Sequence, residues 1–205
     1  MKAKTNVSKA KSRRGFTLVE MLVVIGMIAA LAGISFPVYR SIQKKLDKQR
    51  MAMTYVALGK AIDNFETEYN YLPYIGAAYP DADANYYTLN AVNTFDQFLG
   101  VLMGRGNTSN FKQIEFFSTS EAEGSAPNFK SGIVDNGDGT VTLYTPWGGL
   151  SHGCRLDLNT DGVVRHPFKS AGNNLSMASC LYNPGPKLAW AAPFDDWITD
   201  FPWPE

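Results

Sequence analysis

The sequence predicts an α+β protein, in which one long N-terminal helix precedes a small antiparallel β-sheet. An uncharged run extends from Met21 to Tyr39, and apolar residues continue beyond it at helical spacing as far as Leu72. After residue 130, short segments with alternating side chains are separated by turns rich in Gly, Asn and Asp. At 205 residues, one globular domain and one long helix account for the whole chain.

The first fifteen residues form a basic leader. They contain six basic residues and no acidic one: Lys2, Lys4, Lys9, Lys11, Arg13 and Arg14. A basic head followed by an apolar segment is typical of a protein targeted to the cell envelope. In a secretory signal the small-residue cleavage site follows the apolar segment. Here Gly15 precedes it, so cleavage after Gly15 would leave a helix that starts at Phe16.

Glu20 is the only charged residue between Phe16 and Tyr39. A carboxylate in a membrane helix costs about 2.5–3.5 kcal/mol on insertion scales, which makes it a candidate functional residue. If Phe16 becomes the N-terminus, its ammonium lies about one helical turn from Glu20. The partner is then Phe16 of the same chain or of a neighbouring subunit, and the second option defines a polymer subunit. The alternative is an ordinary signal anchor with a chance glutamate.

These residues carry a family resemblance. The segment Gly15-Phe16-Thr17-Leu18-Val19-Glu20 and the apolar residues that follow resemble the signature of type IV prepilins and type II secretion pseudopilins. The resemblance implies that a membrane aspartyl peptidase cuts after Gly15 and that Phe16 is then N-methylated. It implies that Glu20 aligns subunits during assembly. It also implies a pilin-like fold, most like that of a major pseudopilin, with the helix packed on a small sheet with variable loops.

The helix is predicted to run from Phe16 to Asn70, about 80 Å at 1.5 Å per residue. Its second half carries apolar residues at steps of four and three, which places them on one face as a core stripe: Met51, Tyr55, Leu58, Ile62, Phe65, Tyr69 and Leu72. Pro73 ends the helix. The predicted segments are a leader (1–15), a transmembrane and assembly helix (16–39), an amphipathic half (40–72) and a globular head (73–205).

Charge sets the expected orientation. The leader keeps the N-terminus cytoplasmic, so the head is exported. The family resemblance implies that the membrane is the inner membrane and that the head lies in the periplasm. A second basic cluster follows the apolar run and is smaller and partly opposed by Asp47: Arg40, Lys44, Lys45, Lys48 and Arg50. Residues 51–205 contain eight basic and seventeen acidic residues. Such an acidic head argues against nucleic acid as a partner, since phosphate binding needs clustered Lys and Arg.

In the head, the pattern predicts a loop over 73–88 and a helix over 89–103. Strands are predicted at 132–135 and 140–144 around the turn Asn136-Gly137-Asp138-Gly139. A third strand at 154–158 is predicted to turn into Val163-Val164. Residues 165–193 show little periodicity. The aromatic tail at 194–203 is expected to pack back on the sheet.

One loop is a candidate calcium site. Asp157, Asn159 and Asp161 place oxygen ligands at alternate positions before Gly162. The helix-flanked calcium loop would need a glutamate where Phe168 stands, so further ligands would come from elsewhere, with Asp195 and Asp196 as candidates. The alternative is a β-turn that uses these residues for their geometry.

The family resemblance bears on the same loop, because major pseudopilins bind calcium in this region. They commonly carry Asp-Pro-Trp-Gly before the loop and Asp-Asp-Ile near the end of the chain. Here Thr145 replaces the first aspartate, and Trp197 separates Asp196 from Ile198. Calcium is the only cofactor that the sequence suggests.

Cysteine and histidine allow two further predictions. Cys154 and Cys180 would lie in an oxidising compartment, where a disulfide is expected to stabilise the fold by about 3 kcal/mol. The alternative is two buried thiols. Ser151 and His152 are sequence neighbours, an arrangement that rarely forms a catalytic triad. His152 and His166 are instead expected to be surface or loop residues. We therefore expect no enzyme.

The predicted function is that of a structural subunit of a pilus-like filament. Among such proteins, the resemblance favours a type II secretion pseudopilin that assembles in the inner membrane to drive protein export. Its partners would be itself, related minor pilins, the prepilin peptidase, the assembly platform and the lipid bilayer. One alternative is a pilin whose head binds DNA or another ligand. Another is a membrane-anchored binding protein that never polymerises.

Overall fold

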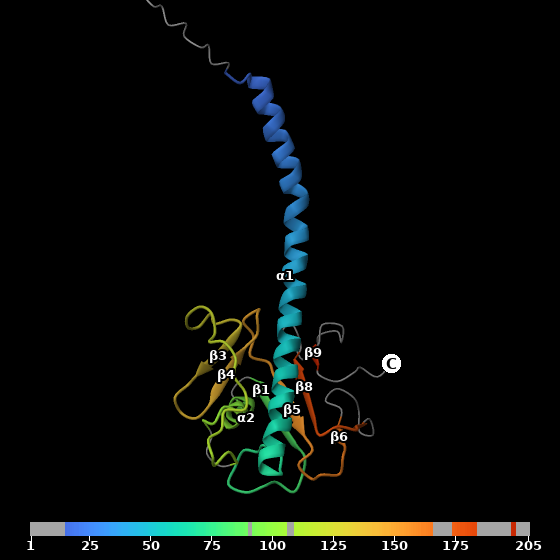
Figure 1. The fold of residues 1–205 in the computed structure, drawn as a ribbon, viewed down its shortest axis with the longest axis vertical. Helices are drawn as coiled ribbons and strands as arrows, with labels where there is room; N and C mark the ends of the chain where they lie inside the picture. Colours follow the sequence, from blue (N-terminus) through green and yellow to red (C-terminus); the bar gives the residue numbers. More distant parts are fainter. Residues whose placement is uncertain (1–14, 90–91, 106–108, 166–173, 184–197, 200–205) are drawn as a thin grey trace, which may run out of the picture. The chain divides into compact units, whose positions relative to one another are not determined.

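The computed structural model describes residues 15–89, 92–105, 109–165, 174–183 and 198–199. The chain divides into two compact units, Met1–Lys44 and Lys45–Glu205. Helix α1 (Leu18–Tyr69) begins in the first unit and ends in the second. The remaining elements belong to the second unit, and its strands form small antiparallel sheets (Figure 1). The predicted α+β class, with one long N-terminal helix and a pilin-like arrangement, is confirmed.

The first unit contains the apolar half of α1. All its large apolar side chains from Phe16 to Ile42 are exposed, among them Leu22, Leu31 and Phe36. Within the described part of the chain, α1 is the one helix with the length and composition to cross a membrane. A helix that is apolar on all sides needs lipid or other protein around it, because water does not solvate such a surface favourably.

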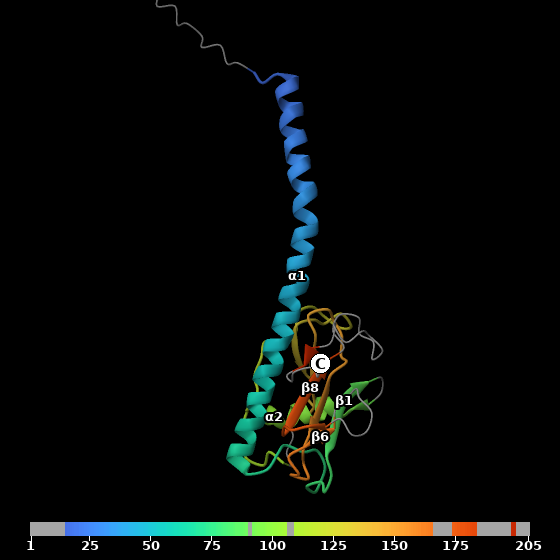
Figure 2. The same cartoon turned by 90° about the vertical axis from the view of Figure 1, so that its right-hand side faces the viewer.

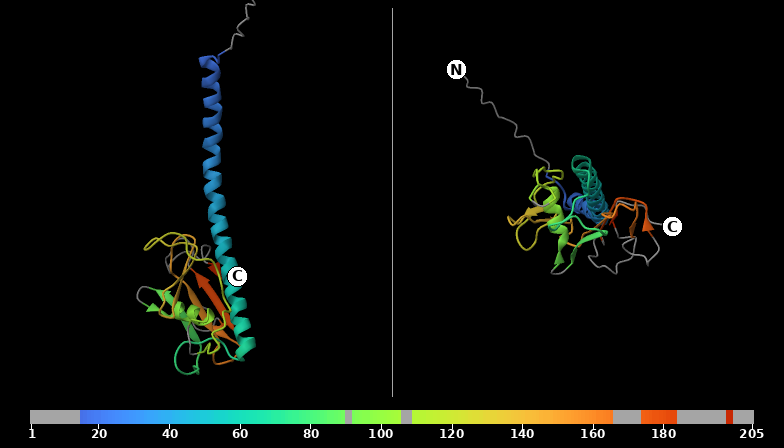
Figure 3. Two further views of the ribbon diagram at one scale, coloured as in Figure 1. Left: turned by 60° about the vertical axis from the view of Figure 1, so that its left-hand side comes forward. Right: turned by 90° about the horizontal axis from the view of Figure 1, so that it is seen from below.

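The second unit is built around a five-stranded sheet. Its order is β2-β1-β5-β8-β9, and each strand pairs antiparallel with its neighbours. The strands are β1 (Ala84–Leu89), β2 (Val92–Asn93), β5 (Gly153–Leu156), β8 (Ser179–Asn183) and β9 (Ile198–Thr199). The register places Tyr86, Cys154 and Leu181 in one cross-strand row. This row faces the core that the C-terminal half of α1 covers (Figures 2 and 3).

The predicted core stripe of α1 is confirmed. All seven residues from Met51 to Leu72 are buried, and none is more than 8% exposed. Met53 and Val56, which lie off the stripe, are exposed. Helix α2 (Thr94–Leu102) adds Phe95, Phe98, Leu99 and Leu102 to the same core. Periodicity alone therefore identified which face of α1 the head would cover.

Strands β3 (Gly132–Asp135) and β4 (Val141–Tyr144) form the predicted hairpin, closed by a hydrogen bond from the Asn136 amide to the Thr140 carbonyl at 3.1 Å. Its turn approaches α2 closely. A Cβ built on Gly100 would lie 2.0 Å from the carbonyl oxygen of Gly139. At position 100, therefore, only glycine allows α2 and the β3–β4 hairpin to pack this closely.

Three predictions in the head are wrong in detail. Residues 84–89 form β1 rather than a loop, and α2 begins at Thr94 rather than at residue 89. Strand β6 (Val164–Arg165) pairs with β7 (Asn174–Leu175) instead of with the third predicted strand. Strand β8 occupies a stretch without visible periodicity. Its Cys180-Leu181-Tyr182 run is buried on both faces, so no alternation of polar and apolar residues marks it.

The expectation that the tail packs back on the sheet holds for β9. Strand β9 pairs with the end of β8, with Tyr182 opposite Thr199 and Asn183 opposite Ile198. The other residues of the predicted tail, among them Asp195 and Asp196, lie outside the described residues.

Candidate functional site

The bond between Gly15 and Phe16 lies just before α1. Both residues are exposed, and the Phe16 side chain is 77% accessible. They precede the first helical residue, Leu18, so the bond is not protected by helical hydrogen bonds. An exposed, non-helical peptide bond is the form that a peptidase can take into its active site.

Glu20 closes a capping box at the start of α1. The Thr17 amide and the Thr17 hydroxyl both donate to Glu20 Oε2, at 2.8 and 2.9 Å. In return, the Glu20 amide donates to Thr17 Oγ1 at 3.2 Å. This reciprocal pattern satisfies donors at the helix N-terminus that have no partner within the helix. The T-x-x-E spacing of Thr17 and Glu20 is the sequence signature of a capping box. The sequence analysis gave Glu20 a role in assembly alone and did not include this contact.

The capping box uses one of the two carboxylate oxygens. Among the described residues, the structure gives no hydrogen bond to Glu20 Oε1. The side chain as a whole is exposed. Oε2 of the carboxylate therefore caps its own helix, while Oε1 is available to accept a hydrogen bond or to form an ion pair with a neighbouring group. A cation on a neighbouring molecule is a suitable partner for that oxygen.

The candidate calcium residues form a hydrogen-bonded turn. The buried Asp157 accepts the amides of Asp161 and Gly162 at 3.2 and 2.7 Å. Asn159 Oδ1 also accepts the Asp161 amide, and Asp161 Oδ1 accepts the amide of Val163. The structure thus brings Asp157, Asn159 and Asp161 together, in contacts that also satisfy the turn's own backbone.

Asp83 joins this loop from a distant part of the chain. Burial raises the pKa of its carboxyl, and the negative charges of Asp157 and Asp161 raise it further. Nothing in the sequence pattern marks Asp83, because its neighbours in space follow it by more than seventy positions. In the described ranges, no group of three or more His, Cys, Asp or Glu residues is arranged to hold a metal ion.

The predicted disulfide is absent. Both cysteines are buried, and they are not joined to each other. In the β5–β8 register, Cys154 stands opposite Leu181 and Cys180 stands opposite Arg155. Cys154 therefore packs in the main core, while Cys180 packs with Val164 and Tyr182 on the other face. Side chains that point to opposite faces of a sheet cannot reach disulfide geometry.

His152 lies in a loop, as expected, but the expectation of a surface position is wrong. It is 1% exposed, and its ring stacks on Phe95 with centroids 5.2 Å apart. Nε2 donates to the Leu143 carbonyl at 2.9 Å, so Nδ1 is the acceptor for the Tyr55 hydroxyl at 2.9 Å. Burial lowers the pKa of His152 to about 4. The ring is a neutral core residue that joins α1 to β4. His166 lies outside the described residues.

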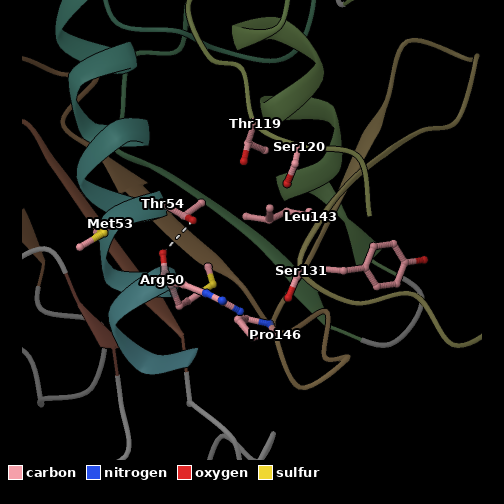
Figure 4. Close-up of a pocket in the computed structure, with 11 residues that line it drawn as sticks. Arg50, Met53, Thr54, Thr119, Ser120, Ser131, Leu143 and Pro146 are labelled. Atoms are coloured by element: carbon pink, nitrogen blue, oxygen red, sulfur yellow. Dashed lines mark hydrogen bonds between the residues drawn. The ribbon is translucent and has the colours of Figure 1, made fainter. Parts of the chain in front are cut away.

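A small cavity of about 250 Å³ opens in the second unit beside α1 (Figure 4). Arg50 and Thr54 line it from the helix, and Ser120, Ser131 and Leu143 line it from the opposite side. The Thr54 hydroxyl donates to the Arg50 carbonyl at 3.0 Å. No carboxylate, histidine or cysteine is among the lining residues, so this cavity lacks the groups of an acid–base or nucleophilic site.

Comparison with known proteins agrees with the geometry at the start of α1. Residues 10–36 match the prokaryotic N-terminal methylation motif. The chain is 38% identical over 61 residues to type II secretion system core protein G of Escherichia coli K12, which is 30% of this chain and 42% of that protein. It is 41% identical over 51 residues to prepilin peptidase-dependent protein D of the same organism, 25% of this chain and 35% of that protein.

A third relative is type II secretion system core protein G of Klebsiella michiganensis, 34% identical over 65 residues, which covers 32% of this chain and 46% of that protein. Each match spans less than half of the relative's length. No solved structure matches the chain. The resemblance to prepilins and pseudopilins that the sequence predicts is confirmed by this motif and by these homologues.

Proposed function

We propose that this protein is a structural subunit of a pilus-like filament, of the type II secretion pseudopilin kind. One observation carries the proposal. The methylation motif covers an exposed cleavage bond and a helix whose large apolar side chains are exposed in the described part of the chain. The role is structural rather than catalytic, since assembly requires shape and complementary charge and no reacting groups.

In this proposal, the prepilin peptidase cuts between Gly15 and Phe16 and the new amine is methylated. The chain is held in the inner membrane by residues 16–39, with its N-terminus in the cytoplasm and its head in the periplasm. Glu20 Oε1 then meets the ammonium of Phe16 on a neighbouring subunit. The attraction is strong because lipid and packed helices screen charges poorly. The subunit also contacts related minor pilins and an inner-membrane assembly platform in this proposal.

A pair of variants separates the two roles of Glu20. Glu20→Gln keeps an oxygen that can accept from Thr17, since glutamine also serves in capping boxes, but it removes the charge. Thr17→Val removes the hydroxyl of the box and leaves the charge in place. We expect Glu20→Gln to abolish subunit crosslinking in cells and Thr17→Val to retain most of it. The proposal fails if Glu20→Gln assembles normally, or if Thr17→Val is the more defective variant.

Processing is measured separately, by mass spectrometry of the protein from cells that contain the peptidase. We expect an amino end at N-methylated Phe16, and Gly15→Leu should block its formation. A chain that retains residues 1–15 in those cells would point to the alternative of an anchored protein that does not polymerise. Binding of nucleic acid to the head that is lost at high salt would point instead to a DNA-binding pilin.

We further propose that the loop at Asp157, Asn159 and Asp161 takes a calcium ion. The support is the concentration of carboxylates there, with Asp83 brought beside Asp157 and Asp161. Hard cations are bound by such oxygen-rich loops, and Asp195 and Asp196 are candidates for the remaining ligands. Excess calcium should raise the Tm above that in EDTA, and Asp161→Asn should remove the difference. An unchanged Tm would refute calcium binding and leave the filament proposal intact.

A further inference from the structure

The basic residues that follow the apolar run are not explained by assembly. Arg40, Lys44 and Lys45 are exposed, and each lies within six positions of the last apolar residue of the run. In the orientation proposed above they are exported, on the side where membrane proteins carry fewer Lys and Arg in their short flanking segments. Positive charge at this place therefore calls for a function of its own.

Arg40 and Lys44 share one face of α1. They are four residues apart, which puts their Cβ atoms about 5–6 Å from each other. Together with Phe36 and Ser41 they line a single hollow on the helix surface, which lies entirely within the first unit. Two like charges at this spacing repel each other, so an anion between them is favoured.

The nearby acid is already engaged. Asp47 Oδ1 lies 3.7 Å from Arg50 Nη1, and the two residues form an ion pair about one turn further along the helix. Among the described residues, the structure gives no ion pair for Arg40 or Lys44. Their positive charges are thus available to a group from outside the chain.

The apolar neighbours define what kind of anion fits. Phe36 is 66% and Tyr39 is 62% exposed, and aromatic rings at the end of an apolar span lie at the level of lipid headgroups. The Arg40 guanidinium, the Ser41 hydroxyl and the Lys44 ammonium follow this level on the side nearer the head. Below it, the exposed apolar side chains of α1 provide a surface along which acyl chains can lie. A ligand with a phosphate at one end and hydrocarbon at the other matches both parts.

We propose that Phe36, Arg40, Ser41 and Lys44 bind the phosphate of an anionic phospholipid. Arg40 donates two parallel hydrogen bonds to non-bridging phosphate oxygens, and Lys44 supplies a point charge on the same group. Phe36 contacts the glycerol and upper acyl region. The bound lipid holds α1 at a fixed depth in the bilayer. The inference relies on membrane insertion of α1, but not on its polymerisation.

The test is lipid binding to the full-length chain in a neutral detergent, followed by native mass spectrometry. The probes are dihexanoyl phosphatidylglycerol, dihexanoyl phosphatidylcholine and glycerol 3-phosphate. We expect phosphatidylglycerol to bind at least tenfold more tightly than either of the other two. Near an anionic surface each basic residue contributes about fivefold, so R40Q/K44Q should lose about 25-fold in affinity.

Two control variants make the result specific. K60Q/K130Q removes the same net charge from exposed positions elsewhere, and R40K/K44R keeps both charges in place. Both should retain the preference for phosphatidylglycerol. The proposal is overturned if K60Q/K130Q weakens binding as much as R40Q/K44Q, or if glycerol 3-phosphate binds as tightly as the lipid. Glu20→Gln should bind lipid normally, which separates this site from the assembly proposal.

Discussion

The two halves of α1 share one backbone conformation and differ in what surrounds them. In the first half, every large apolar side chain up to Ile42 is exposed. In the second half, the stripe from Met51 to Tyr69 is buried, and Met53 and Val56 on the opposite side are exposed. Apolar residues occupy all sides of the first half and one side of the second. The head therefore covers one side of the second half, whereas the large apolar side chains of the first half are exposed among the described residues.

Because of this difference, substitutions in the two halves of α1 should affect different properties of the protein. Substitutions in the stripe should change the free energy of unfolding of the head, because they alter close-packed contacts. Substitutions in the first half should change insertion and assembly and leave the head unaffected.

The largest expected change in the free energy of unfolding comes from the buried stripe of α1. Phe65 is fully buried, with ring centroids 4.6 Å from Tyr69 and 5.2 Å from Phe116. Phe65→Ala should lower the free energy of unfolding by about 3–5 kcal/mol, from lost burial and a residual cavity. The matched change Leu31→Ala should alter it by less than about 0.5 kcal/mol. Urea unfolding of the full chain in detergent, followed by tryptophan fluorescence, measures both. Equal effects would contradict the separation.

The next largest effect depends on pH. His152 has an ordinary pKa of about 6.5 when unfolded and of about 4 when folded, because burial disfavours its charged form. Between these values the unfolded state binds more protons, so stability should fall by about 3 kcal/mol from pH 7 to pH 4.

His152→Gln should remove this loss, and urea unfolding at several pH values measures it. The raised pKa of Asp83 acts in the opposite direction, since its folded form binds the proton more readily as the pH falls. The difference between wild type and variant isolates His152, because Asp83 is common to both. A parallel pH dependence in the two proteins would show that His152 does not titrate across unfolding.

A pair of glycines gives a smaller contrast. Gly100→Ala should cost about 1–3 kcal/mol, because its Cβ would collide with the Gly139 carbonyl oxygen and force α2 away from the hairpin. Gly26→Ala lies in the first half of α1, where a Cβ meets no atom within 4 Å apart from the backbone of its own helix. It should leave the Tm of the head unchanged. A destabilised head in Gly26→Ala would mean that the two halves are coupled.

The smallest expected effect concerns the cysteines. Because Cys154 and Cys180 point to opposite faces of the β5–β8 pair, reductant should not change the Tm. Both thiols should react with an alkylating agent after unfolding without prior reduction. A shift in non-reduced electrophoresis that reductant abolishes would show that the two strands pair in another register.

Some of the candidate site could be predicted from sequence. Gly15, Phe16 and Glu20 are recognisable because their spacing relative to the apolar run is local. The capping contact between Thr17 and Glu20 is equally local, because the T-x-x-E spacing is the sequence signature of a capping box. Asp83 was not predictable, because only the folded chain brings it beside Asp157.

By itself, the sequence determined the long helix, its buried stripe, its end before Pro73 and the β3–β4 hairpin. Each of these depends on neighbours within a few positions, where the 3.6-residue and 2-residue periods act directly. Only the tertiary structure decided that β5 lies between β1 and β8, that His152 is in the core and that the cysteines face apart. A shift of one residue in the pairing of two distant strands moves every side chain to the other face, and no local pattern fixes that register.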